Sequence, residues 1–79
     1  MYTRAVNYKN AVATNVREAR KAKKWTQEKL ALKADLSSEF ISKIERGNNN
    51  MSVGSLLRIA RALGTTVVQL IQGVDEAEI

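Results

Sequence analysis

Polar side chains that can exchange hydrogen bonds with another molecule gather in the segment 26–50. Short hydroxyls, amides and charged groups alternate there with isoleucines, which are buried residues in most folds. Eleven of these polar residues are candidates for contacts with another molecule: Thr26, Gln27, Ser37, Ser38, Glu39, Ser42, Lys43, Arg46, Asn48, Asn49 and Asn50. Groups of these types bind phosphates and the edges of bases without making or breaking a covalent bond. The chemistry that this segment offers is therefore recognition.

The sequence is poor in the residues that catalysis needs. It contains no cysteine and no histidine, which excludes a thiolate nucleophile, a zinc–thiolate site and the commonest general base. It also lacks a phosphate-binding glycine loop and a nucleophile elbow. We therefore expect no catalytic residue, no metal and no cofactor, and an enzyme is the least favoured class. RNA binding is also disfavoured, because aromatic residues that stack on bases are scarce.

Charge is distributed unevenly along the chain. Residues 1–50 hold eleven Lys and Arg against five Asp and Glu, whereas residues 51–79 hold two against three. A basic first part suits contact with a polyanion, and a nearly neutral second part suits a subunit interface. With 79 residues, the chain makes one small domain that dimerisation would stabilise. No apolar run approaches the ~18 residues of a membrane span, so we expect a cytoplasmic protein without membrane contact.

Helical periodicity predicts the first two elements. Val12, Val16 and Ala19 share one face of a helix from about residue 10 to 23. The opposite face is assigned to Arg17, Lys21 and Lys24. Thr26 is a favourable N-cap for the second helix, and Glu28 in its first turn complements the helix dipole.

The third predicted helix follows a short turn at residues 35–37. Ser37 caps it, Ile41 and Ile44 face inward, and Gly47 ends it. Because the isoleucines take the inner face, the outer face carries Ser38, Glu39, Ser42 and Lys43.

Two further helices complete an all-α fold without strands. Ser52 caps the fourth helix, and Gly64 ends it. Its inward stripe is predicted to comprise Val53, Leu56, Leu57, Ala60 and Leu63. A capping box from Thr66 to Gln69 begins the short fifth helix, which Gly73 ends. The predicted organisation is an N-terminal arm (1–9), a five-helix domain (10–73) and an acidic C-terminal tail (74–79).

Four motifs carry a family resemblance that covers roughly residues 10–72. They are Val16-Arg17-x-x-Arg20, Trp25-Thr26-Gln27-x-x-Leu30-Ala31, Ile41-Ser42-x-Ile44-Glu45-Arg46-Gly47 and Leu56-x-x-Ile59-Ala60-x-Ala62-Leu63-Gly64. In these motifs the chain resembles the lambda-repressor/Cro-like, or xenobiotic-response-element, family of helix-turn-helix proteins. The resemblance implies a lambda-repressor-like fold that binds double-stranded DNA. Its third helix, about Ser37–Arg46, would lie in the major groove.

The resemblance also implies roles for single residues. Gln27 would bond a phosphate and brace the recognition helix, and Arg20 and Glu45 would form a structural ion pair. Positions on the outer face would reach base edges, with Lys43 donating to guanine and Glu39 accepting from cytosine. For Ser42 the alternative is a bond to the backbone one turn earlier.

The loop after the third helix would track the phosphate backbone through Arg46 and the amides of residues 48–50. For every one of these polar residues, the simpler alternative is a solvated surface. The chain departs from the family at Phe40, where many relatives have a tyrosine, so one possible phosphate contact is absent. It also departs at Trp25 and Met51.

A single recognition helix contacts only a few base pairs. We therefore expect a homodimer on a pseudo-palindromic operator whose half-sites lie ~10–10.5 bp apart. Candidate interface residues are Val67, Val68 and Ile71 of the fifth helix. The alternative is that these three side chains fill the core of the monomer.

The sequence is compatible with more than one mode of regulation. The sequence shows no effector-binding region, so we expect no small-molecule effector, and RNA polymerase or a partner protein is a candidate partner. Small members of the family include Cro-like repressors and restriction–modification controller proteins, and residues 50–56 resemble the controllers. Repressor and activator remain alternatives. A rival function is an antitoxin-type module that binds a partner protein, through residues 75–79, and autoregulates on DNA.

Overall fold

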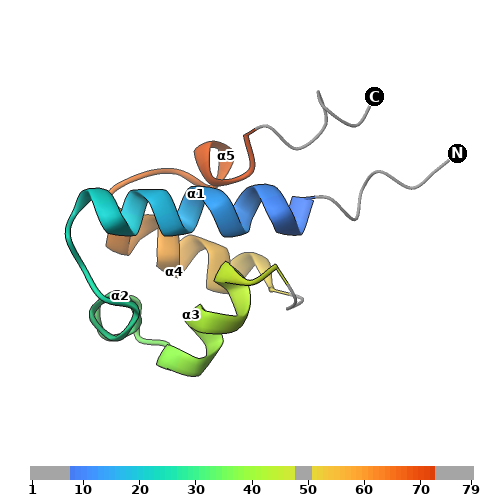
Figure 1. Cartoon of the computed structure of the whole chain (residues 1–79). Helices are drawn as coiled ribbons and strands as arrows, with labels where there is room; N and C mark the ends of the chain where they lie inside the picture. The colour runs from blue at the N-terminus through green and yellow to red at the C-terminus, as the bar shows by residue number, and fades with distance from the viewer. Residues whose placement is uncertain (1–7, 48–50, 73–79) are drawn as a thin grey trace, which may run out of the picture.

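The computed structural model describes residues 8–47 and 51–72, and every regular element in these ranges is a helix (Figure 1). The helices are α1 (Tyr8–Ala22), α2 (Gln27–Ala34), α3 (Ser38–Glu45), α4 (Val53–Leu63) and α5 (Val67–Leu70). The predicted all-α, five-helix class is confirmed. The first helix begins two residues earlier than the sequence predicted. The expected ends at Gly73 and in the C-terminal tail lie outside the described residues.

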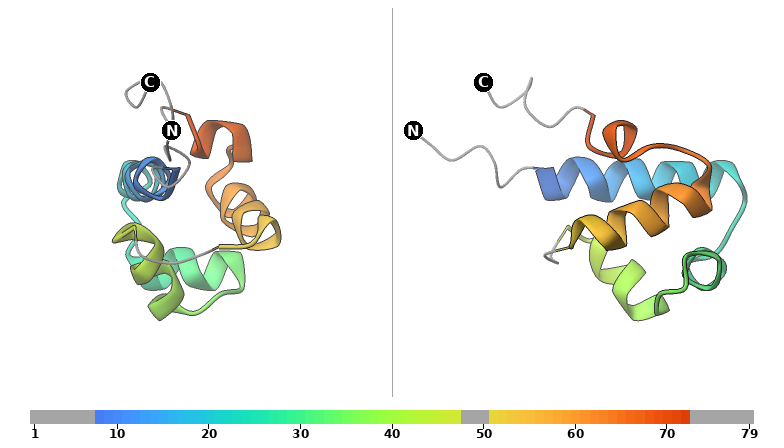
Figure 2. Two further views of the ribbon diagram at one scale, coloured as in Figure 1. Left: turned by 90° about the vertical axis from the view of Figure 1, so that its right-hand side faces the viewer. Right: turned by 180° about the vertical axis from the view of Figure 1, so that it is seen from behind.

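The longest helix, α1, holds the other elements together. It packs against α3 on one side and against α4 and α5 on another, while α2 packs between α3 and α4. Figure 2 shows the consequence from two sides, with α2 and α3 grouped at one edge of α1 and α5 at the opposite edge. One rigid helix therefore contacts both the predicted recognition helix and the predicted dimer helix.

Four helices begin with the hydroxyl caps that the sequence predicted. In each case the hydroxyl oxygen accepts a hydrogen bond from the amide three residues later, which satisfies a donor that lacks a helical partner. The pairs are Thr26–Lys29 at 3.0 Å, Ser37–Phe40 at 3.1 Å, Ser52–Ser55 at 3.0 Å and Thr66–Gln69 at 3.1 Å. The capping box of α5 is only half formed, because the side chain of Gln69 bonds the Thr65 hydroxyl.

Residues in the left-handed region of backbone space end two helices and shape two turns. Gly47, with φ of 76°, and Gly64, with φ of 74°, follow α3 and α4 as predicted. Lys24 and Asp35 adopt similar φ values of 62° and 59° although each carries a Cβ. That conformation is unfavourable for most residues, and aspartate tolerates it better than lysine does.

The core forms where all the helices meet. Its largest fully buried side chains are Val12, Val16, Leu30, Ile41, Ile44, Ile59 and Leu70. The predicted inner stripe of α4 was wrong in part, since Val53 is 70% exposed and Leu57 is 44% exposed. Successive helical residues point about 100° apart, and the buried side of α4 is centred near Leu56 and Leu63, which leaves Leu57 at its edge. The buried residues of α4 are Leu56, Ile59, Ala60 and Leu63.

Candidate nucleic-acid interface

The predicted recognition helix α3 has a buried side and a free polar side. Ile41 and Ile44 are fully buried, so they fix the rotation of the helix about its own axis. Ser38, Glu39 and Lys43 are exposed. Within the described part of the chain, none of these three side chains forms a hydrogen bond or an ion pair. They therefore remain available for contacts with another molecule.

Ser42 and Arg46 bond to each other along the edge of this face. The Arg46 Nη1 donates to the Ser42 Oγ at 3.2 Å, one helical turn away. The alternative in which Ser42 bonds the backbone of the preceding turn was wrong. The hydroxyl is instead a brace for an exposed guanidinium at the end of α3, where the resemblance placed a phosphate contact.

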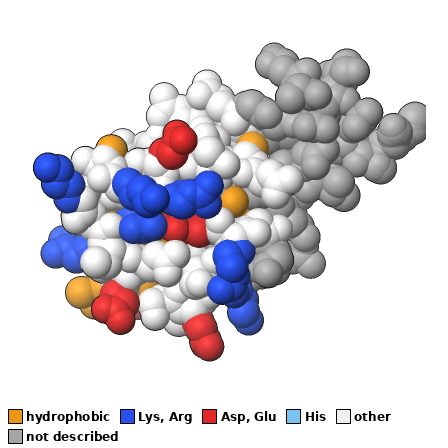
Figure 3. Space-filling view, viewed as in Figure 1, with side chains coloured by type: hydrophobic (Ala, Val, Ile, Leu, Met, Phe, Trp, Pro, Cys, Tyr) orange, Lys and Arg blue, Asp and Glu red, His pale blue; other side chains and the backbone are white. Residues whose placement is uncertain are grey.

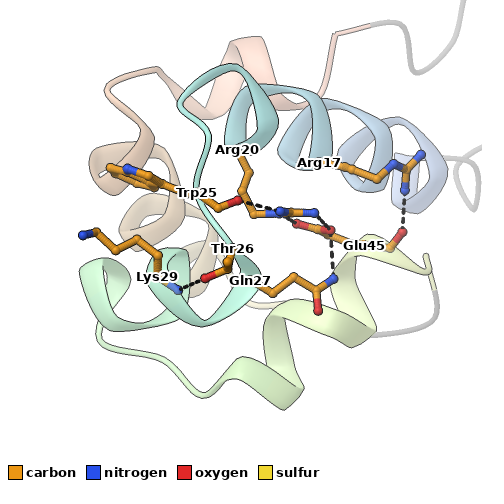
Figure 4. Close-up of polar contacts among 7 residues, drawn as sticks. All are labelled: Arg17, Arg20, Trp25, Thr26, Gln27, Lys29 and Glu45. Carbon is orange, nitrogen blue, oxygen red and sulfur yellow. Dashed lines mark hydrogen bonds and ion pairs between the residues drawn. The ribbon is translucent and has the colours of Figure 1, made fainter.

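The carboxylate of Glu45 joins three helices at the other side of α3 (Figure 4). Glu45 is only 5% exposed, so its charge requires partners. The Arg20 Nε donates to its Oε2 at 2.7 Å, and the Arg20 Nη2 donates to its Oε1 at 3.0 Å. The Gln27 Nε2 also donates to Oε1 at 3.0 Å. The expected ion pair is present, and Gln27 ties the start of α2 to the recognition helix.

The contacts with Glu45 also affect the protonation of Arg20. The side-chain hydrogen bond that Arg20 donates to Glu45 raises the pKa of Arg20; burial opposes this shift, and the charge of Glu45 adds to it. A folded pKa above the unfolded value means that the stabilisation is fully present below the unfolded pKa of arginine. This contribution of Arg20 is lost as the pH rises through the folded value, in strongly alkaline solution. The Arg20 Nη1 also donates to the Trp25 carbonyl at 2.7 Å.

Arg17 has a role that the sequence analysis missed. It was assigned to the solvated face of the first helix, but its Nη1 donates to the Glu45 carbonyl at 2.9 Å. A cation at this place satisfies an unpaired carbonyl and complements the negative end of the α3 dipole. The available signal was its spacing from Arg20, since residues three apart lie on adjoining parts of a helix surface.

The surface around α1 and α3 is rich in cations. Figure 3 shows basic side chains over α1 and beside α3, with acidic side chains between and around them. Lys23 and Lys33 also place their ammonium groups 5.1 Å and 6.0 Å from the centre of the Trp25 ring. The only tryptophan of the chain therefore reports on the junction of α1 and α2.

The structure describes some of the other residues predicted to contact DNA but not all of them. The hydroxyls of Thr26 and Ser37 accept the capping bonds of α2 and α3, which leaves each its own hydrogen to donate. Asn48, Asn49 and Asn50 lie outside the described residues, so their predicted phosphate contacts stay predictions.

The predicted dimer residues also separate into two groups. Val68 is 66% exposed and Ile71 is 36% exposed. Val67 instead packs, partly buried, against the core of the monomer, so the structure does not support its assignment to an interface. Leu57 of the neighbouring α4 adds an exposed apolar side chain that the sequence analysis had placed in the core.

Comparison with known proteins identifies the family of this fold. A family model described as "Helix-turn-helix" matches residues 16–70, a range that contains α2 and α3 and the helices that hold them. The chain belongs to the helix-turn-helix family. Among the described residues, no helix is both long enough and apolar enough to cross a membrane.

Individual members of the family extend this result. An uncharacterized HTH-type transcriptional regulator, y4dJ of Sinorhizobium fredii, is 32% identical over 90% of this chain and 92% of its own length. Control protein C.BamHI of Bacillus amyloliquefaciens is 46% identical over 62% of each chain. The crystal structure of the restriction–modification controller protein C.AhdI from Aeromonas hydrophila has a TM-score of 0.76 and 32% identity. That match covers 78% of this chain and 94% of C.AhdI. The family and these relatives make this chain a DNA-binding transcriptional regulator and not an enzyme.

Proposed function

We propose that this regulator binds a pseudo-palindromic DNA operator as a homodimer, with α3 of each subunit in the major groove. The observation that carries the proposal is the two-sided character of α3. Buried isoleucines and the contacts of Glu45 fix its inner side, while Ser38, Glu39 and Lys43 project outward. A rigid helix with short polar side chains on its outer face is the arrangement that base recognition requires.

The proposed base contacts follow from donor and acceptor types. Lys43 donates to guanine, Glu39 accepts from the cytosine amino group, and Ser38 bonds either kind of base edge. Each serine side chain is short, so the backbone of α3 approaches the bases closely.

The proposed phosphate contacts flank this face. Gln27 uses one Nε2 hydrogen on Glu45 and keeps a second for a phosphate, beside the amides at the start of α2. Thr26, Ser37 and Ser42 lie along the same edges, and Arg46 with the amides of residues 48–50 follows the DNA backbone beyond α3.

A homodimer is supported by the apolar surface of the second half. Val68 of α5, Ile71 directly after α5 and Leu57 of α4 are exposed, and α4 packs against α5. Burial of such side chains in a symmetric interface removes them from water. The resulting dimer carries two recognition helices, which doubles the number of base contacts. We place this surface at the two-fold axis of the complex.

The names of the relatives support one biological role in particular. C.BamHI is a control protein, and C.AhdI is a restriction–modification controller whose chain is matched over 94% of its length. We propose that this protein is a cytoplasmic regulator of the same type, which controls genes through its own concentration and the arrangement of its operators.

Selection of bound duplexes from a random pool tests the proposed function directly. The expected result is an enriched inverted repeat whose affinity falls steeply with salt, because binding releases counterions. Lys43→Ala should change the preferred bases, whereas Arg61→Ala, which removes the same charge from the exposed side of α4, should not. Weak, salt-sensitive binding to every sequence without enrichment would contradict the proposal.

A further inference from the structure

Helix α5 depends on its neighbours for its position. It contains four residues, and Leu70 is its only buried side chain. Isolated helices of this length are not stable in water, because nucleation costs more than so few hydrogen bonds return. The contacts that fix α5 are therefore few enough to name.

One side chain of α1 holds the end of α5. The Asn15 Nδ2 donates to the Leu70 carbonyl at 2.7 Å and to the Gln72 carbonyl at 3.1 Å, with a longer contact of 3.4 Å to the Gln69 carbonyl. The last carbonyls of a helix lack partners within the helix, so a single amide satisfies several of them at once. Asn15 and the Leu70 side chain, with the partly buried Val67, fix α5 against the rest of the domain.

The recognition helix is fixed to the same short stretch of α1. Arg17 and Arg20 hold the end of α3 through the carbonyl and the carboxylate of Glu45. Val16, fully buried, lies between Asn15 and Arg17 in the chain. From Asn15 to Arg20 a helix advances only ~7.5 Å. This stretch is thus a short, stiff connection between α3 and α5.

We propose that Asn15 is a positioning residue that sets the half-site spacing accepted by the dimer. The inference rests on the proposed homodimer with α5 at its interface. In that dimer, the separation of the two recognition helices depends on the angle between α3 and α5 within each subunit. Asn15 fixes that angle at the α5 end. Without it, α5 pivots about Leu70, and the dimer fits operators of several spacings while each half-site is still recognised.

The test compares operators that differ only in spacing. Wild type, Asn15→Ala and Thr14→Ala are titrated with a single half-site and with inverted repeats at the preferred spacing and at one base pair less or more. Thr14 is exposed on α1 and is the matched control. Wild type and Thr14→Ala should prefer one spacing by about tenfold. Asn15→Ala should reduce that preference to about twofold while its single half-site affinity stays within about twofold of wild type.

A second variant guards against simple unfolding. Asn15→Asp keeps the size of the side chain but points carboxylate oxygens at carbonyls, so it should broaden the spacing preference at least as much. Trp25 fluorescence checks that the α1–α2 junction is intact in each variant. An unchanged spacing preference in both variants would overturn the inference, and so would an equal loss of affinity for the single half-site. A wild-type protein that sediments as a monomer on a single half-site and on inverted repeats alike would instead remove the homodimer, and this inference with it.

Discussion

The ends of α3 and α5 are both held by side chains of α1, but with unequal redundancy. At α3, Arg17, Arg20 and Gln27 all donate to Glu45, and two buried isoleucines support the helix from within. At α5, the attachment consists of Asn15, Leu70 and the partly buried Val67. The difference indicates that the helix proposed to read the bases is fixed firmly, whereas the helix proposed to form the dimer interface is held by few contacts. The two properties should therefore be separable by mutation.

The largest effect is expected from Glu45→Ala, which removes the centre of the α3 attachment. Arg20, whose side chain is 11% exposed, would lose its opposite charge and keep only the bond to the Trp25 carbonyl, and Gln27 would lose its acceptor. We expect a loss of about 3 kcal/mol in the free energy of unfolding. Urea denaturation followed by Trp25 fluorescence measures it. Glu39→Ala on the exposed side of the same helix is the control and should change stability by less than about 0.5 kcal/mol.

Reversal of the ion pair separates charge from packing at the same place. Arg20→Glu and Glu45→Arg each bring like charges together in a site where the side chains are 11% and 3% exposed. The double reversal restores opposite charges, so it should retain more of the fold than either single variant. Thermal unfolding of the four proteins tests this. Equal midpoints for all of them would disprove the pairing.

At the weaker attachment, Leu70→Ala should cost about 2 kcal/mol, because it opens a cavity where α5 meets the core. Hydrogen exchange should then show α5 amides losing protection while those of α3 keep theirs. Val68→Ala, on the exposed face of the same helix, should leave monomer stability nearly unchanged. Equal loss of protection in both helices would contradict the separation.

Matched threonine N-caps compare α2, which packs against α3, with α5. Thr26→Ala at α2 should cost about 1 kcal/mol, since it removes the bond to the Lys29 amide. Thr66→Ala at α5 removes an equivalent bond but should reduce global stability by less, because α5 opens locally before the domain unfolds. Chemical denaturation gives the global values. A larger loss for Thr66→Ala would reverse the proposed ranking.

The smallest expected effect is a gain in the stability of the domain. Asp35 has φ of 59° at the turn between α2 and α3. Asp35→Gly should stabilise the domain by about 0.5 kcal/mol, the relief of strain being partly offset by a freer unfolded chain. The lost contact with Arg58 matters little, because those charges lie 3.9 Å apart with the carboxylate side chain 96% exposed. A stability decrease in thermal unfolding would contradict the assignment of strain to this residue.

Local chemistry explains which features were predictable. The hydroxyl caps and terminal glycines act within three or four residues, so the sequence alone indicated them, and the motif shared with the family indicated the ion pair. Asn15 and Arg17 donate to backbone carbonyls far away in sequence. Every residue has a backbone carbonyl, so the residue type at the acceptor position does not indicate the bond. The sequence pattern placed Leu57 in the core, whereas the structure buries Ile59, and this error has a different cause. Adjacent apolar residues leave the phase of a helix ambiguous until the packing of its neighbours decides it.

The outward side chains of α3 also bear on how such a regulator changes over evolutionary time. Ser38, Glu39 and Lys43 make no hydrogen bond or ion pair in the described part of the chain, and the isoleucines and Glu45 fold the helix without them. After gene duplication, these positions can therefore vary with little loss of stability, so one copy can acquire a new set of target genes while the other keeps the old one. The separation of the residues that fold the helix from those proposed to contact DNA makes the fold a reusable frame for new regulatory circuits.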